Sequence, residues 1–165
     1  ETIMKKLFLV GALALFGALS AQRVQKGESQ INAGLGFSSD WGTPVYVGLD
    51  YGVHKDVTIG AEASFASHKY DGDVKGKWFG IGANANYHFN SVFKIPNNWD
   101  LYAGVTLAYN SFSYDNSAFN GEASGVGFSG QIGGRYYFND KFGVNVEFGG
   151  GTVASGGKAG ISYKF

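Results

Sequence analysis

The sequence predicts an all-β fold, an up-and-down antiparallel barrel of eight strands that follows a cleavable signal peptide. Three observations predict this fold. Apolar and polar residues alternate along eight segments, glycine supplies 27 of the 165 residues, and no segment after the leader has a helical period. A period of two gives a strand one apolar face and one polar face.

The beginning of the chain has the features of a secretory signal peptide. Lys5 and Lys6 precede an apolar run from Leu7 to Ala18, and small residues follow at a suitable cleavage site. A transmembrane helix would need about 20 apolar residues, which this run does not reach. We therefore predict a leader and signal peptide over residues 1–21 and a barrel domain over residues 22–165.

Each predicted strand is justified by its apolar positions. In the first half of the chain these are Ile31, Ala33, Leu35 and Phe37; Val45, Val47, Leu49, Tyr51 and Val53; Val57, Ile59, Ala61, Ala63 and Phe65; and Phe79, Ile81, Ala83, Ala85, Tyr87 and Phe89. In the second half they are Leu101, Ala103, Val105, Leu107 and Tyr109; Val126, Phe128, Ile132, Tyr136 and Phe138; Phe142, Val144, Val146 and Phe148; and Ala159, Ile161, Tyr163 and Phe165. Joints at 54–56, 90–98 and 139–140 alternate with joints at 39–44, 70–75, 114–121 and 154–157.

The two faces of these strands indicate a transmembrane barrel. The apolar face carries no charged residue, and Lys or Arg near a bilayer midplane costs about 2–4 kcal/mol. Glycine, serine and asparagine dominate the polar face, as a narrow lumen requires. We expect the apolar face to contact lipid. We also expect the first strand to pair with the last, because lipid offers no hydrogen-bond partners to the backbone groups of an open sheet edge. A soluble, secreted ligand-binding barrel is the alternative.

Composition excludes several functions. The formal net charge is zero, so nothing in the sequence favours nucleic acid, and the absence of cysteine excludes disulfides and thiolate metal sites. Asp71 and Asp73 fall short of the six to eight oxygens that calcium takes. We expect no metal and no cofactor.

The last strand resembles the C-terminal strand of Gram-negative outer-membrane β-barrels, which ends on Phe and is read by the insertion machinery. Here Ile161, Tyr163 and Phe165 would form that signal. The whole mature chain is similar to the small eight-stranded barrels that include OmpX and the OmpA transmembrane domain, and its leader resembles those of flavobacteria. The resemblance implies an outer-membrane location, periplasmic termini, contact with membrane lipids and lipopolysaccharide, and no catalytic motif.

The polar face also carries charges that a lumen must neutralise. We predict an interior polar plug in which Arg135 neutralises carboxylates, made of Asp50, Glu62, Arg135 and Glu147 with Gln131 and Tyr102 filling gaps. The alternative is a narrow porin-like channel or an ion path through the barrel.

The long joints offer a second candidate site. Phe112, Tyr114 and Phe119 lie among small polar residues, a composition that suits surface contact with a host or cell-surface ligand. In OmpX-like relatives the long middle strands protrude as a contact sheet, and the fifth and sixth strands could be extended in this way. The alternative is that these aromatic residues pack against the membrane-facing belt.

We expect a structural or adhesion-type barrel and not an enzyme. Some related barrels modify lipid A with a His-x-Ser pair, but none of the three histidines has a serine two positions later. An outer-membrane lipid-modifying enzyme remains the less favoured alternative.

Overall fold

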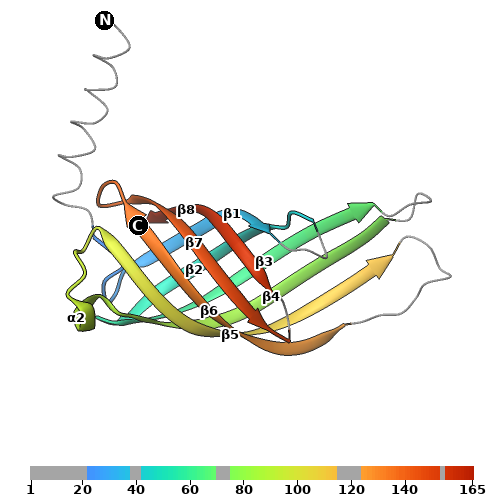
Figure 1. Cartoon of the computed structure of the whole chain (residues 1–165), viewed down its shortest axis with the longest axis horizontal. Helices are drawn as coiled ribbons and strands as arrows, with labels where there is room; N and C mark the ends of the chain where they lie inside the picture. Colours follow the sequence, from blue (N-terminus) through green and yellow to red (C-terminus); the bar gives the residue numbers. More distant parts are fainter. Residues whose placement is uncertain (1–21, 38–41, 70–74, 115–123, 153–154) are drawn as a thin grey trace, which may run out of the picture.

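The computed structural model describes residues 22–37, 42–69, 75–114, 124–152 and 155–165, which form a closed antiparallel barrel (Figure 1). The strands are β1 (Ser29–Phe37), β2 (Val45–His54), β3 (Val57–Lys69), β4 (Lys75–His88), β5 (Trp99–Tyr114), β6 (Gly125–Tyr137), β7 (Phe142–Gly151) and β8 (Gly156–Lys164). Each strand pairs with its neighbours in chain order. The predicted eight-stranded fold is confirmed.

The barrel closes where β1 pairs with β8. Their register runs from Gln30 opposite Lys164 to Phe37 opposite Gly157. Every strand thus has a partner on both sides, so the backbone groups of the spanning region are paired within the protein, as hydrocarbon requires.

The orientation of the faces is the predicted one. Ile81, Val105 and Val146 lie on the outer surface with 52%, 61% and 46% of their areas exposed, whereas Arg135 is 4% exposed. Polar side chains lie in the interior instead, among them Gln30, Asn32, Asp50, Thr58, Asn86, His88, Asp100, Gln131, Asn145 and Ser162. A water-soluble barrel would show the reverse arrangement.

The two ends of the barrel differ in their connections. At one end, here called the turn end, lie the joints at 55–56, 89–98 and 138–141 together with residues 22–28 and the C-terminal Phe165 (Figure 1). At the other, the loop end, β1 is joined to β2, β3 to β4, β5 to β6 and β7 to β8. Parts of these loop-end joints lie outside the described residues.

The joint before β5 contains α2 (Asn90–Phe93), a helix of one turn that the sequence did not predict. Four residues are too few to show a period of 3.6. The helix ends at Lys94, which adopts the left-handed conformation with φ of 52°. No helix in the described part of the chain is long and apolar enough to cross a membrane.

Three neighbouring strands extend beyond the others at the loop end (Figure 1). The pairing of β3 with β4 continues to Lys69 opposite Lys75, and that of β4 with β5 to Gly76 opposite Tyr114. The registers of β3 with β2 and of β5 with β6 end earlier, at Phe65 and at Asn110. We call residues 66–69, 75–78 and 111–114 the protruding sheet. The expected extension of β5 is present. The described part of β6 begins at Gly125, and residues 115–123, which would form its expected extension, lie outside the described residues.

An N-terminal segment, residues 22–28, lies against the turn end. The backbone N–H of Arg23 donates to the carbonyl of Asn97 at 2.8 Å, and its guanidinium contacts Asp56 at 3.1 Å. Val24 is only 1% exposed. The segment therefore links the turn after β2 to the joint before β5 and is part of the folded body.

Aromatic rings line the outer surface at the turn end, as expected of a membrane-interface belt. The ring centroids of Trp99 and Tyr136 are 4.7 Å apart, and those of Phe142 and Tyr163 are 4.8 Å apart. Toward the loop end Phe65 and Phe79 face outward opposite each other.

Candidate functional site: the barrel interior

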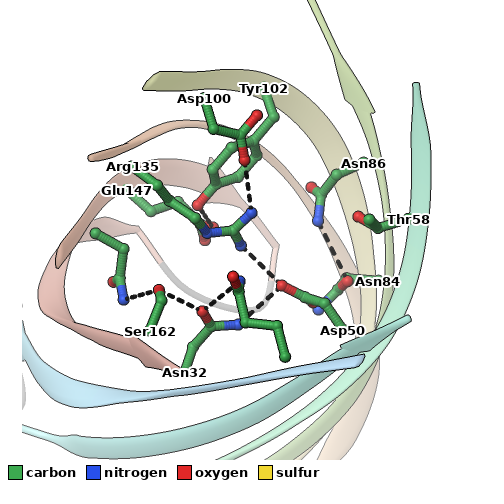
Figure 2. A network of polar contacts seen from close by, with 12 residues as sticks. Asn32, Asp50, Thr58, Asn84, Asn86, Asp100, Tyr102, Arg135, Glu147 and Ser162 are labelled. Carbon is green, nitrogen blue, oxygen red and sulfur yellow. Dashed lines mark hydrogen bonds and ion pairs between the residues drawn. The ribbon is translucent and has the colours of Figure 1, made fainter. Parts of the chain in front are cut away.

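The deepest charged cluster is centred on Arg135 of β6. Its Nη2 lies 2.8 Å from Oδ2 of Asp50 on β2, and its Nη1 lies 3.1 Å from Oδ2 of Asp100 on β5 (Figure 2). The Arg135 guanidinium carbon sits 4.2 Å from the centroid of the Tyr102 ring. We call Arg135, Asp50, Asp100 and His88 the arginine layer. The planar guanidinium of Arg135 contacts two carboxylates and the face of an aromatic ring, which are the partners that a guanidinium prefers.

His88 completes this layer from the end of β4. Its Nδ1 lies 2.6 Å from Oδ1 of Asp100, and its Nε2 lies 2.9 Å from the Thr58 hydroxyl. The His88 side chain is fully buried. Both ring nitrogens and both Asp100 oxygens therefore have partners, which a buried polar group needs.

A second charged cluster lies closer to the loop end. Lys158 of β8 places its Nζ 2.5 Å from Oε2 of Glu62 on β3 and 3.0 Å from Oε1 of Glu147 on β7. The Tyr102 hydroxyl donates to the other oxygen of Glu147 at 2.7 Å. We call Lys158, Glu62 and Glu147 the lysine layer. Tyr102 connects it to the arginine layer (Figure 2).

This arrangement corrects the predicted pairing. Arg135 neutralises Asp50 but contacts neither Glu62 nor Glu147, which pair with Lys158 instead. Asp50 lies opposite Gly60, and Glu62 lies one step further along β3, opposite Gly48. The carboxylates therefore belong to two layers and not to one patch.

Sequence reasoning also missed two participants. Asp100 is absent from the predicted plug, although it lies directly opposite Arg135 on the neighbouring strand. Lys158 is also absent from it, although it lies directly opposite Glu147. The signal in the sequence is opposite charge on the polar faces of neighbouring strands, but the register that brings each pair together is not fixed by the sequence.

Amide and hydroxyl side chains connect the layers to the wall. Asn32 donates to Asp50 at 2.8 Å and accepts from Ser162 at 2.7 Å (Figure 2). Gln131 donates to Asn86 at 2.9 Å and accepts from the Thr106 hydroxyl at 3.0 Å. Gln131 and Tyr102 therefore both have hydrogen-bond partners in the interior, Gln131 with Asn86 and Thr106 and Tyr102 with Glu147.

A cavity of about 350 Å³ lies in the loop half of the lumen. The lysine layer lines it, together with the aromatic residues Tyr46, Trp78 and Phe112. The described part of the interior therefore contains charged and polar side chains near the turn end and open space toward the loop end.

The turn end carries its own buried ion pair. Oδ1 of Asp56 contacts Arg23 and accepts a hydrogen bond from the Ser91 hydroxyl. That hydrogen bond, helped by the positive charges of Lys55 and Arg23, lowers the pKa of the Asp56 carboxyl below its ordinary value of 3.8, against the opposing effect of burial. Asp56 is thus held as a carboxylate that fastens the N-terminal segment.

The predicted contact residues separate in the structure. Phe112 lies opposite Trp78 and lines the cavity. Tyr114 is the last residue of β5, and Phe119 lies outside the described residues. Of the predicted insertion signal, Ile161 and Phe165 are 57% and 63% exposed on the outer surface of β8 and the C-terminus.

No group of three or more histidine or acidic side chains that could hold a metal ion is found in the described ranges. Asp71 and Asp73 lie outside those ranges.

A closed eight-stranded barrel with an apolar outer face and a polar interior defines the class of small integral β-barrel membrane proteins. The family model for the outer membrane protein beta-barrel domain matches residues 8–165. The chain belongs to this family, whose location is the bacterial outer membrane.

Several solved structures are similar to this barrel. The outer membrane protein OprG from Pseudomonas aeruginosa is 14% identical over 88% of this chain and 99% of its own, with a TM-score of 0.64. The N-terminal barrel domain of P. aeruginosa OprF is 18% identical over 85% and 98%, with a TM-score of 0.61. Ail, the attachment invasion locus protein of Yersinia pestis, is 13% identical over 86% and 100%, with a TM-score of 0.53. At identities this low, the structural likeness establishes the shared fold alone. No curated protein sequence matches the chain.

Proposed function

We propose that this protein is a non-enzymatic surface-contact barrel of the outer membrane, with its lumen closed by side chains and its termini in the periplasm. The observation that carries the proposal is the protruding sheet. In the part of the chain that the structure describes, β3, β4 and β5 alone continue their pairing beyond the common rim, to Lys69, Lys75 and Tyr114. A sheet that extends from a membrane-embedded barrel suits contact with another surface better than it suits transport.

The interior supports the closed-lumen part of the proposal. Arg135, Asp50 and Asp100 are each less than 5% exposed. They lie between strands on different sides of the barrel, and an eight-stranded barrel is just wide enough for side chains to fill. The proposed polar plug consists of the arginine layer and the lysine layer, with Gln131 and Tyr102 between their partners.

Adhesion of cells is the direct test of the contact role. Cells displaying the wild-type protein should bind host cells or matrix proteins better than cells displaying a variant with residues 112–119 replaced by Gly and Ser. Lys94→Ser with Asn97→Ser at the turn end is the matched control and should adhere like wild type. Equal adhesion by the 112–119 variant and the wild type, at equal surface levels, would contradict the contact role.

A narrow channel for small solutes is the second candidate, favoured by the 350 Å³ cavity in the loop half of the lumen. A catalytic role in lipid modification is the third. The hydroxyl–imidazole–carboxylate chain of Thr58, His88 and Asp100 has the order of such a site, but all three side chains are buried in the lumen, where a lipid does not reach them. Mass spectrometry of lipid A from cells with and without the protein would reveal such an activity as a changed acyl chain.

A further inference from the structure

The cavity in the loop half of the lumen exists because the residues around it are small. Below Trp78, two rows of inward residues on β3, β4 and β5 leave space in the lumen, and Glu62 is the largest residue among them: first Ser64, Gly80 and Asn110, then Glu62, Gly82 and Ala108. The resulting volume of about 350 Å³ falls within the range of natural ligand sites, about 300–1,000 Å³. The cavity is therefore large enough to hold a small organic molecule.

The lysine layer gives this cavity a negatively charged floor. Glu62 and Glu147 share one ammonium group, that of Lys158, at 2.5 Å and 3.0 Å. These three side chains are 16% to 22% exposed, whereas those of Arg135 and its two carboxylate partners are at most 4% exposed. The lysine layer is thus accessible from the cavity, and two carboxylates with one ammonium leave one negative charge there.

No other basic residue near the loop end balances that charge. Arg135 already contacts two carboxylates of its own layer. The lysines of the protruding sheet occupy outward positions, in line with Phe65 on β3 and Phe79 on β4. The connections at the loop end contain no Lys or Arg but five acidic residues, Asp40, Asp71, Asp73, Asp115 and Glu122. The field of these charges favours a cation that arrives from solution.

Glu62 provides the point of attachment for such a cation. Its Oε2 accepts a hydrogen bond from Lys158, and no described residue donates to its Oε1. Both oxygens of Glu147, by contrast, have partners in Lys158 and the Tyr102 hydroxyl. A carboxylate oxygen with a free lone pair forms its strongest hydrogen bonds with charged N–H donors. A primary ammonium group therefore suits Glu62.

Trp78 provides an apolar surface above the charged floor. A Cβ built at Gly80 would lie 3.0 Å from Cζ2 of Trp78, so the indole lies over Gly80, on the side that faces the lysine layer. Gly80 is one inward step from the row of Glu62, which corresponds to about 7 Å. A ligand that places its ammonium group on Glu62 can therefore bring a flat apolar group, two or three bonds away, against the indole.

We propose that the loop half of the lumen is a binding site for a small primary ammonium ion that carries a flat apolar group. The ammonium group donates to Glu62, and the apolar group packs against Trp78. This inference goes beyond the proposed function, because binding at this site requires neither the contact role nor a closed lumen.

The test uses the full barrel in phosphatidylcholine nanodiscs and phenethylamine, which is protonated at pH 7, as the probe. Isothermal titration at low salt, with empty nanodiscs as the blank, should show saturable binding of one molecule per barrel. Glu62→Gln should weaken binding at least about tenfold, because it replaces a charge-assisted hydrogen bond by a neutral one. The matched control is Glu28→Gln, which removes the carboxylate from a lysine pair at the turn end and should bind like wild type.

A second variant separates loss of the site from damage to the fold. Lys158→Gln should bind phenethylamine several-fold more tightly, because both carboxylates then lack their cation, whereas a damaged barrel would bind it more weakly. Heat-dependent gel mobility verifies that the variant is folded. Trp78→Ser should weaken binding several-fold, and Trp78→Phe should retain most of it, since a phenyl ring preserves the apolar contact.

Two analogues of the probe test its charge. The neutral 2-phenylethanol should bind at least about tenfold more weakly than phenethylamine, and the anionic 3-phenylpropanoate should not bind measurably. The inference is overturned if the wild type does not bind phenethylamine, if Glu62→Gln binds it as well as wild type, or if folded Lys158→Gln binds it no more tightly. Equal binding of either analogue would also overturn it, because the site would then not select a cation. A barrel that binds the amine but fails in adhesion would contradict only the proposed contact role.

Discussion

Arg135 and Asp50 are 85 residues apart in the sequence, yet Nη2 of the guanidinium lies 2.8 Å from Oδ2 of the carboxylate inside the barrel. Both side chains are about 4% exposed. The cost of desolvating such a pair offsets most of its attraction, so the pair adds little net stability. Removing one member is strongly destabilising, because the other charge is then buried without a partner. It fixes β2 against β6 from opposite parts of the chain.

Replacing Arg135 by Met should destabilise the barrel by about 3–5 kcal/mol, because Asp50 and Asp100 would remain buried without their cation. Urea unfolding in lipid vesicles measures the change. Lys141→Met on the exposed turn is the control and should shift stability by less than about 0.5 kcal/mol. Adding Asp50→Asn to Arg135→Met should recover part of the loss. A single-variant loss below about 1 kcal/mol would show that the pair is not structurally important.

The proposed closed lumen predicts that the wild-type barrel passes no steady current. Two charged layers and the N-terminal segment lie in series, so we expect Arg135→Ala alone to give at most brief, irregular openings. Planar-bilayer recordings of wild type and Arg135→Ala test this. Steady, well-defined conductance steps from the wild-type protein would refute the plug and favour the channel.

Gly104 on β5 should not tolerate a side chain. A Cβ at this position would lie 2.2 Å from the Ala85 carbonyl oxygen and 2.2 Å from Oδ1 of Asn86, closer than atoms can approach. Gly104→Ala should lower the yield of folded barrel, measured by heat-dependent gel mobility. Gly150→Ala, which meets nothing within 4 Å, should fold like wild type. Normal folding of Gly104→Ala would mean that β4 and β5 can move apart.

The Asp56 carboxylate predicts a pH dependence at the turn end. Its folded pKa is lowered, chiefly by Ser91, so its contribution to stability is complete above the unfolded value near 4 and is lost as pH falls through the folded value. Ser91→Ala should cost about 1 kcal/mol at pH 7 and less at pH 2, where the carboxyl is protonated. Ser113→Ala on the protruding sheet should show no such dependence. Urea unfolding at both pH values makes the measurement, and a loss independent of pH would contradict the assignment.

The strands and their faces could be predicted from the sequence because a period of two is a local property. Successive side chains of a strand point to opposite faces, so Ile81 and Val105 point outward while the residues next to them point inward. This alternation does not depend on how the strands pair. The partners inside the lumen could not be predicted in this way, because they depend on the stagger between strands. A register shift between Gly52 and His54 changes the count from the turn to Asp50. Asp100 and Arg135 are joined by a long connection that permits no count at all.

The N-terminal segment had no periodic pattern and was predicted only as the start of the domain. Its burial comes from tertiary contacts of Arg23 and Val24, which a local pattern cannot reveal. The short helix α2 was missed for the related reason that one turn carries too little pattern. The elements with long, regular alternation were therefore predictable, and the pieces that close the turn end were not.

The burial of Arg23 and Val24 limits where the predicted leader can be cut from the barrel. A peptidase that cut after either residue would remove Arg23, the ion-pair partner of Asp56, and would destabilise the turn end of the barrel. A cut at residue 21 or 22 keeps this ion pair. An affinity tag joined directly to Arg23 would press against the joint at Asn97, so tagged versions need a spacer ahead of Gln22.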